Sequence, residues 1–484
     1  MKQTLLSQKS ILKICIALLT TAIICFLSIA LTKAVCSDER EHLYATFATY
    51  SGKIPYRDFF EHHHPLLWYI GSLFLYINDN TPYIWYTLRI FMVIVTLATS
   101  FFIYKISKIQ QLSTPISIIG ATIYLSLYEV KYSGLEYRPD NLMILFFTSG
   151  LYFLLSYFKK TKPYLLNISI ILFFLSFLSL QKSILILAPI FFIFILPNLN
   201  NKTFFKDFLR SLITPLILLL SLILALYKTN SLIDYVELNW LLNRHIEILE
   251  NYTKETIIQT LSEQFICIIT SIFLFIKTPQ YRKLISSYIL SFLILSIMFF
   301  KFKMPLYEQY FLMLAPYLAI IAILIINKYK NTPLFCNLTL IILSVTILIS
   351  GILKVHSYKI KEINLQTHIV LDKIIYTYSD KNDSVVCAIE LSTVGGLRHC
   401  AQGYYFFSLG SLAPIHSFYF NGRELPRLNN VIQTRLPKIV VNSGWADCKL
   451  NNHNNKIECG NQEIDVAKME KHYTNNGFIY LRKY

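Results

Sequence analysis

The residues best suited to chemistry gather between positions 36 and 69, directly behind a long apolar segment. This stretch carries the acidic pair Asp38-Glu39, then Asp58, Glu61 and three consecutive histidines. Acidic groups held at a membrane face are costly unless they face water or a substrate. A carboxylate in that position can accept a proton from an acceptor hydroxyl or amine, as a general base does.

Asp38 has two compatible interpretations. As a general base it would lie just past the membrane exit, with Glu39 beside it. As an N-cap it would form a capping box with Glu41, three residues later. A capped helix also fixes a neighbouring carboxylate, and His42 lies one turn after Asp38, within i,i+4 reach.

The histidine run follows an arginine and two carboxylates in the motif YRDFFEHHHP. Alternate residues of an extended segment share a face, so His62 and His64 with Glu61 could bind a divalent metal. The alternatives are a hydrogen-bonded cluster at the membrane interface or a contact to phosphate. Arg57 could hold phosphate through its planar guanidinium, with Asp58 beside it.

A second polar segment covers residues 129–140 and contains Glu136, Arg138 and Asp140. Pro139 is suited to the first turn of the next helix, and an acidic residue after it favours the positive end of that helix. The functional alternative is that these charged side chains face the first loop across a cleft.

Lys182 interrupts two apolar runs, which is costly unless it is paired, faces a polar cavity or extends to the membrane surface. A phosphate contact is the functional interpretation of this lysine. The stretch KFKMPLYEQY, which contains Tyr307 and Glu308, leaves the same two options open.

The composition is that of a membrane protein. Hydrophobic residues make up 54% of the 484 residues and charged residues 15%, whereas soluble proteins carry about 25% charged residues. The net charge of +17 arises from short basic clusters between apolar runs, as the positive-inside rule predicts. No basic–aromatic groove motif supports nucleic-acid binding, and no phosphate-binding glycine loop supports a soluble nucleotide as substrate.

Eleven apolar runs approach the length that crosses a bilayer. They cover about 14–35, 84–104, 114–128, 141–157, 164–180, 183–197, 211–227, 260–276, 285–300, 308–326 and 334–353. We expect a polytopic α-helical membrane domain over residues 1–353, with the first run kept as an anchor because Ala34-Val35-Cys36 is a poor signal-cleavage site.

The basic loops predict a cytoplasmic N-terminus, and we expect the membrane to be a bacterial inner membrane. The outer loops are then 36–83, 129–140, 228–257 and 301–307, where nearly all carboxylates before residue 354 fall. The loop 228–257 mixes apolar and charged residues, which fits either an amphipathic surface helix or a covering loop.

From residue 354 the chain becomes soluble in character. Strand-like runs at 384–390, 438–442 and 478–482 predict a small α/β domain over 354–484. An odd number of spans makes this domain extracytoplasmic, or periplasmic in a bacterium. Its four cysteines, Cys387, Cys400, Cys448 and Cys459, are compatible with disulfides there.

These features together resemble the GT-C class of membrane glycosyltransferases, in the branch of protein O-mannosyltransferases and lipid A aminoarabinose transferases. The resemblance covers about residues 10–350 and is carried by a short set of motifs. They are Asp38-Glu39, GKIPYRDFFEHHHPLLW at 52–68, Arg138-Pro139-Asp140, Gln181-Lys182 and YEQYFLMLAP at 307–316. The absence of a WWDYG-like stretch argues against an oligosaccharyltransferase.

The resemblance implies transfer of a sugar from a polyprenyl-phosphate carrier to an envelope acceptor on the outer face. Asp38 would be the catalytic base, supported by Glu39. Lys182 with Arg57 or Arg138 would hold the donor phosphate and stabilise its developing charge. Supporting or substrate-binding residues would be His42, Asp58, Glu61, His64, Glu136, Asp140, Tyr307 and Glu308. The displacement would invert the anomeric carbon and require no metal, although a divalent metal near Glu61, His62 and His64 stays an alternative.

The implied partners are the lipid-linked donor, membrane lipid and an acceptor, which could be lipopolysaccharide, another glycan or a protein. Two other functions remain open. A transporter or flippase for a lipid-linked substrate would be expected to show repeated halves and ionisable groups at mid-membrane depth. A non-catalytic assembly protein of the envelope would not depend on Asp38.

Overall fold

The computed structural model describes residues 8–77, 83–241, 268–269, 271–302, 308–329 and 365–378, together with seven short strands between 385 and 482. The chain divides into two compact units, and each unit is made of three segments that are not consecutive in the sequence. Unit 1 contains Met1–Leu31, Arg89–Leu222 and Glu247–Ile360, and unit 2 contains Thr32–Leu88, Ile223–Ile246 and Lys361–Tyr484. Each unit is described by itself.

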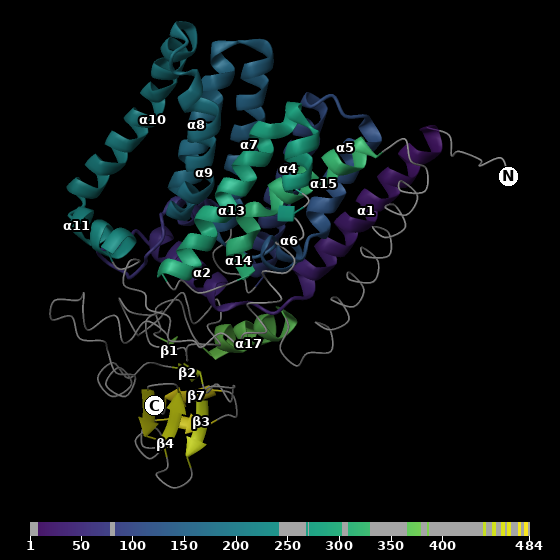
Figure 1. Cartoon of the computed structure of the whole chain (residues 1–484). Coiled ribbons are helices and arrows are strands. Elements are labelled where there is room, and N and C mark those ends of the chain that lie inside the picture. The colour runs from purple at the N-terminus through teal and green to yellow at the C-terminus, as the bar shows by residue number, and fades with distance from the viewer. Residues whose placement is uncertain are drawn as a thin grey trace. The chain divides into compact units, whose positions relative to one another are not determined.

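Unit 1 is a helical bundle (Figure 1). Its α-helices are α1 (Gln8–Thr32), α4 (Ile84–Ile109), α5 (Thr114–Ser126), α6 (Tyr128–Ser133), α7 (Pro139–Lys160), α8 (Pro163–Ser179), α9 (Ile184–Ile190), α10 (Lys202–Lys228), α13 (Arg282–Phe302), α14 (Glu308–Phe311) and α15 (Ala315–Lys328). Short 3₁₀ turns lie at Gln181–Ser183 (η1), Leu196–Asn198 (η3), Pro279–Tyr281 (η6) and Leu312–Leu314 (η7), and a π-helical turn at Phe191–Ile195 (η2).

Seven helices of the described residues are long and apolar enough to cross a membrane, so the chain is an integral membrane protein. They are Lys9–Thr32, Ile84–Ile109, Pro139–Lys160, Gln181–Asn198, Lys202–Lys228, Pro279–Met298 and Gln309–Lys328. Each coincides with an expected span. The expected spans 114–128 and 164–180 appear as the shorter apolar helices α5 and α8. The span expected at 260–276 is described only in part and 334–353 lies outside the described residues, so the count of eleven stays a prediction.

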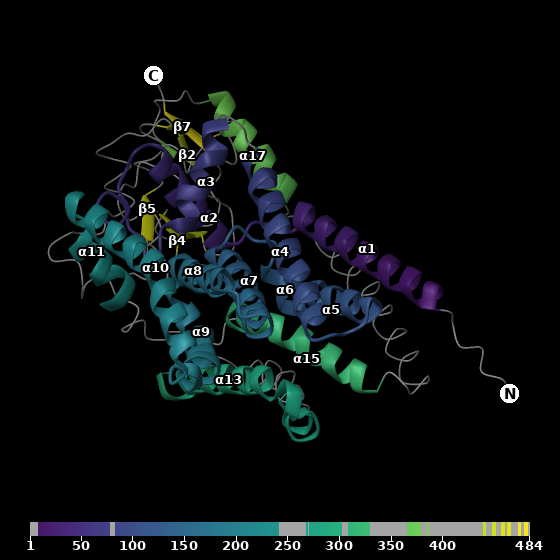
Figure 2. The ribbon, with the colours of Figure 1, turned by 90° about the horizontal axis from the view of Figure 1, so that it is seen from above.

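Helix pairs in unit 1 are joined by small residues and hydroxyls. Helices α7 and α8 run side by side, as do α5 with α15 and α9 with α13 (Figure 2). Ser169 Oγ donates to the carbonyl of Gly150 and Ser176 Oγ to the carbonyl of Met143, both at 2.8 Å. Small residues let helices approach closely in lipid, where such hydrogen bonds add modest stability.

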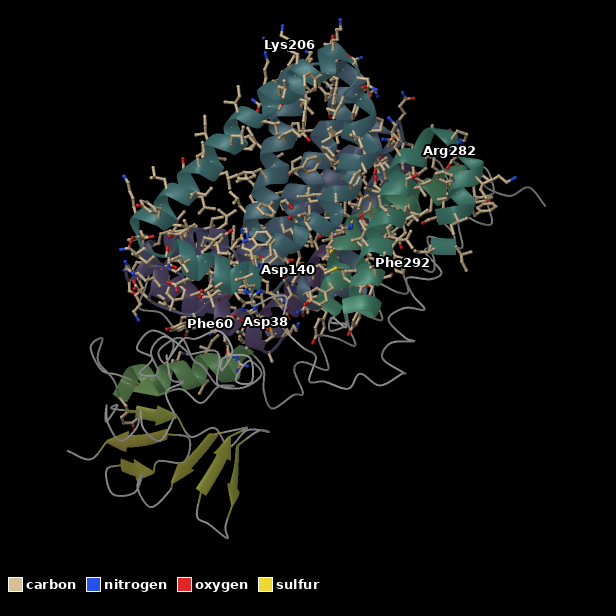
Figure 3. The ribbon with its side chains drawn as sticks, turned by 60° about the vertical axis from the view of Figure 1, so that its left-hand side comes forward. Asp38, Phe60, Asp140, Lys206, Arg282 and Phe292 are labelled. Atoms are coloured by element: carbon tan, nitrogen blue, oxygen red, sulfur yellow. The ribbon has the colours of Figure 1, made fainter. Side chains whose placement is uncertain are left out.

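Charged residues mark the two ends of the helices in unit 1. Asp140 at the start of α7 and Lys206 near the start of α10 lie at opposite ends of the bundle (Figure 3). Helix α7 ends at Lys159 and Lys160, in an αL cap at Thr161 with φ 52°. Asp140 and the basic pair Lys159-Lys160 therefore lie at opposite ends of α7, while the orientation of the chain in the membrane stays a prediction.

Unit 2 contains the polar loop that follows α1. Its helices are α2 (Ser37–Tyr50), α3 (Leu66–Ile77), α11 (Leu232–Val236), a π-helical turn η4 (Glu237–Leu241) and α17 (Leu365–Tyr378). Helix α2 packs against α3. In the expected surface segment 228–257, Ile233 is 73% exposed while Leu238 is buried, so its described part is two-sided. Residues 242–257 lie outside the described residues.

The C-terminal region contributes seven strands to unit 2. They are β1 (Val385–Val386), β2 (Ile439–Val441), β3 (Cys448–Asn451), β4 (Lys456–Cys459), β5 (Gln462–Asp465), β6 (Tyr473–Asn475) and β7 (Ile479–Arg482). One sheet has the order β1-β2-β7-β6, with β1 parallel to β2, and the other is the antiparallel β3-β4-β5. Strands β1, β2 and β7 fall within the three predicted runs, while β3 to β6 were not predicted. The α/β domain and its boundary at 354 remain predictions.

Candidate active site

Helix α2 carries Asp38 in its first turn, but the capping box is formed by other residues. Cys36 is the N-cap, and its Sγ accepts from the Glu39 backbone N–H at 3.4 Å. The Glu39 carboxylate accepts from the Cys36 N–H at 3.2 Å. The predicted capping box of Asp38 with Glu41 is therefore wrong, because the box begins two residues earlier, at Cys36. Glu39 supplies the capping carboxylate. Asp38 lies half-buried at the second position of the helix, where the positive end of the helix dipole favours its negative charge.

The loop after α2 is folded on itself by Asp58. Asp58 Oδ2 accepts from the Ile54 N–H at 2.8 Å, while Arg57 donates to both carboxylate oxygens at 2.8 and 2.9 Å. The hydrogen bond from Arg57 lowers the pKa of the Asp58 carboxyl. Arg57 also donates to the carbonyl of Thr229 at 3.0 Å. This exposed guanidinium is thus occupied by protein groups.

Tyr56 orients the histidine run. Its φ of 71° lies in the left-handed region that non-glycine residues seldom adopt. The fully buried phenol donates to the carbonyl of His63 at 2.8 Å. Its ring packs against Trp68 and Tyr235. Burial, the largest cause, raises the pKa of Tyr56 well above its usual value, so the phenol stays protonated.

The three histidines do not alternate, because the rings of His62 and His63 lie together with centroids 4.0 Å apart. His62 Nδ1 lies 3.5 Å from Glu41 Oε1, and His63 Nδ1 lies 2.7 Å from Glu61 Oε1. His64 is directed elsewhere, with Nε2 3.5 Å from the Tyr235 hydroxyl and its ring against Trp240. The expected grouping of Glu61, His62 and His64 is therefore replaced by Glu41, Glu61, His62 and His63.

His64 is more deeply buried than His62 and His63. Desolvation lowers its pKa to about 4, so the ring is neutral at physiological pH. His42, predicted to lie within reach of Asp38, is also buried and accepts from the Trp68 indole N–H at 3.4 Å. Its ring lies edge-on to His63, with centroids 4.9 Å apart. His42 therefore supports the histidine run.

In unit 1, Arg138 is the centre of a buried polar network. Its guanidinium lies 3.6 Å from Glu136 Oε2 and 3.4 Å from Asp140 Oδ2, and it donates to Gln309 Oε1 at 3.2 Å. All three charged side chains are buried. Helix α7 begins at Pro139, as predicted. Asn141 holds the preceding turn by donating to the carbonyls of Ser133 and Glu136.

Lys182 lies in the 3₁₀ turn η1 that interrupts the apolar helices α8 and α9. Its ammonium nitrogen is 4.2 Å from the centroid of the Tyr310 ring. An aromatic face stabilises a cation near apolar surroundings. Tyr310 follows Gln309, the partner of Arg138, so α14 contributes to the surroundings of both cations.

The remaining expected residues carry less information. Tyr307 lies outside the described residues, and Glu308 begins α14 without a described side chain. Four residues of these networks were expected from the sequence only in other roles. Glu41 was expected as a capping partner, His63 as a member of the histidine run, and Gln309 and Tyr310 as part of the YEQY motif.

The chemistry of these groups is clear within each unit. Unit 2 presents Asp38 on a capped helix that also carries the buried Glu41 and His42. Unit 1 presents two cations, Lys182 and Arg138, suited to an anionic group such as phosphate. A general base and a phosphate-binding pair are the parts that a group transfer from a phosphorylated carrier requires.

A family model and a solved structure both match this chain. Residues 62–227 match the family model of dolichyl-phosphate-mannose-protein mannosyltransferase. The matched range contains the histidine run, Arg138 and Lys182, and begins after Asp38. No curated protein gives a significant match to the chain.

Among solved structures, the chain is similar to ArnT from Cupriavidus metallidurans, determined with undecaprenyl phosphate bound. The TM-score is 0.55 at 9% sequence identity, over 79% of this chain and 84% of that one. The chain therefore has the fold of the GT-C membrane glycosyltransferases, which confirms the resemblance expected from the sequence.

Proposed function

We propose that the protein transfers a sugar from a polyprenyl-phosphate carrier to an acceptor on the outer face of the membrane. The observation that carries this proposal is the pair of networks in an ArnT-like fold. One contains Asp38 on a helix capped by other residues, and the other contains Lys182 and Arg138. ArnT itself was solved with undecaprenyl phosphate, which supports a carrier of this class.

In the proposed reaction, Asp38 removes a proton from the acceptor hydroxyl or amine. The acceptor oxygen or nitrogen attacks the anomeric carbon from the side opposite the phosphate. The bond between that carbon and the phosphate oxygen breaks, the carrier leaves as polyprenyl phosphate, and the configuration inverts. Lys182 and Arg138 stabilise the charge that develops on the leaving phosphate.

We favour Arg138 over Arg57 for this role on the ground of burial. Both guanidinium groups have carboxylate partners, but Arg138 is buried and Arg57 is exposed. A buried guanidinium interacts with phosphate in surroundings of lower dielectric constant, where the attraction is stronger. Glu39 acts as a positioning residue, because its carboxylate caps the helix that carries Asp38.

The acceptor is proposed to be a glycolipid, a glycan or a protein of the cell envelope. The experiment compares envelope glycolipids and glycoproteins by mass spectrometry in cells with the gene, without it, and with the Asp38→Asn protein. We expect loss of one sugar residue from a defined species in the last two. Unchanged profiles, with the variant protein inserted at the wild-type level, would favour a transporter or an assembly protein.

A further inference from the structure

Unit 2 holds a cluster of metal-ligating side chains in which Glu41 of α2 meets three residues of the following loop. One potential ligand atom from each of Glu41, Glu61, His62 and His63 lies within 4.8 Å of the other three. Three separations define the group: 2.7 Å from His63 Nδ1 to Glu61 Oε1, 3.5 Å from His62 Nδ1 to Glu41 Oε1, and 3.9 Å from His62 Nδ1 to Glu61 Oε1.

Both carboxylates of the cluster are buried, with Glu41 4% exposed and Glu61 0% exposed. The second carboxylate oxygen of Glu61, Oε2, is buried with no hydrogen-bond partner among the residues that the structure describes. Burial of ionised carboxylates is costly unless charge or hydrogen bonds compensate it. A divalent cation would compensate both carboxylates at once and occupy the lone pairs of Glu61.

We propose that this cluster binds a zinc ion. Two imidazole nitrogens and two carboxylate oxygens form a donor set that suits Zn²⁺. Tetrahedral zinc with bonds of about 2.1 Å holds its ligand atoms about 3.4 Å apart. The three separations of 2.7, 3.5 and 3.9 Å bracket that value, so small side-chain shifts would complete the coordination. With four protein ligands the coordination is filled, which makes the ion structural.

The ion would join the loop to the helix that carries Asp38. Glu41 lies three residues after Asp38 on α2, whereas the other three ligands come from the loop. The metal would therefore fix the orientation of α2 against the loop, a positioning role that rests on the proposed function of Asp38. His64 is outside the set, because its ring packs against Tyr235 and Trp240.

The test measures metal content and thermal stability of the full chain, purified in detergent with an affinity tag free of histidine. We expect about one zinc ion per wild-type chain by elemental mass spectrometry. Glu61→Gln and His63→Ala should each lower the zinc content at least about fivefold. The matched controls, His64→Gln and Asp58→Asn, change the same loop outside the cluster and should keep the zinc.

A zinc chelator should lower the melting temperature of the wild type, and added zinc should restore it, while the His63→Ala protein should respond to neither. His63 is only partly buried, so this variant remains informative if Glu61→Gln fails to fold. Folded wild-type protein that carries no stoichiometric zinc and gains no stability from added zinc would overturn the proposal. The Asp38→Asn protein should keep its zinc while losing transfer, which separates this test from that of the proposed function.

Discussion

The ammonium nitrogen of Lys182 lies 4.2 Å from the centroid of the Tyr310 ring. Because Lys182 interrupts two apolar helices, the ring provides a favourable place for a charge that would otherwise be costly near lipid. The contact also leaves the ammonium protons able to bind an anion. The relationship therefore agrees with a lysine that holds the carrier phosphate.

Replacement of Lys182 by alanine should weaken binding of polyprenyl phosphate. We expect the dissociation constant to rise about ten- to a hundredfold, since a lost charge-assisted hydrogen bond is worth about 1.5–3 kcal/mol. Titration of the purified protein with the carrier measures this. Tyr310→Phe keeps the aromatic face and should bind nearly as the wild type does. Equal affinity of Lys182→Ala and wild type would exclude Lys182 from the phosphate site.

Replacement of Arg138 by glutamine should destabilise unit 1. Glu136 and Asp140 would lose their shared guanidinium, and breaking a buried ion pair costs about 3–5 kcal/mol. Thermal unfolding in detergent measures the loss. The control is Arg57→Gln, which breaks an exposed pair and should leave the melting temperature nearly unchanged. Loss of carrier binding in Arg57→Gln with stability intact would transfer the phosphate role to Arg57.

Replacement of Gly150 by alanine should disturb the packing of α7 against α8. A Cβ atom there would lie 2.7 Å from two ring carbons of Phe173, a distance that packed atoms do not tolerate. We expect a loss of about 1–3 kcal/mol, as overpacking usually costs. The second change Phe173→Leu should restore part of it. If the double variant is no more stable than Gly150→Ala, the ring contact is not the cause.

Cys448 and Cys459 should form a disulfide. They are direct register partners in the antiparallel pair β3–β4. Such partners have Cα atoms about 4.5–5.5 Å apart, within the range that a disulfide spans. Thiol labelling of denatured protein should modify them only after reduction. Labelling without reduction would contradict the disulfide.

The long apolar helices could be predicted from the sequence because hydropathy over about 20 residues is a strong signal. Strands β1, β2 and β7 were also predictable, because 385–386 and 439–441 are short β-branched runs and 479–482 begins with the apolar residues Ile, Tyr and Leu. Strands β3 to β6 were missed because residues such as Lys449, Glu458 and Gln462 give no apolar run.

The sequence indicated which residue types form the site, but it did not indicate which of these side chains contact one another. The capping box moved to Cys36 and Glu39 because the Cys36 sulfur takes the place usually held by a serine or aspartate side chain. Alternation in an extended segment placed His62 with His64. The loop is not extended, since Tyr56 adopts a positive φ and Pro55 bridges to Phe59. Such tertiary details have no local sequence signal.

The central claim is transfer from a lipid-linked donor that depends on Asp38. The most direct measurement reconstitutes the purified protein in vesicles with polyprenyl-phosphate sugars and an envelope extract as acceptor, and follows release of free polyprenyl phosphate. Wild-type protein should release the carrier together with a glycosylated acceptor. Asp38→Asn should be slower by at least about a hundredfold at unchanged melting temperature, as expected for loss of a general base. Equal rates for the two proteins, or no release by folded wild-type protein, would contradict the account.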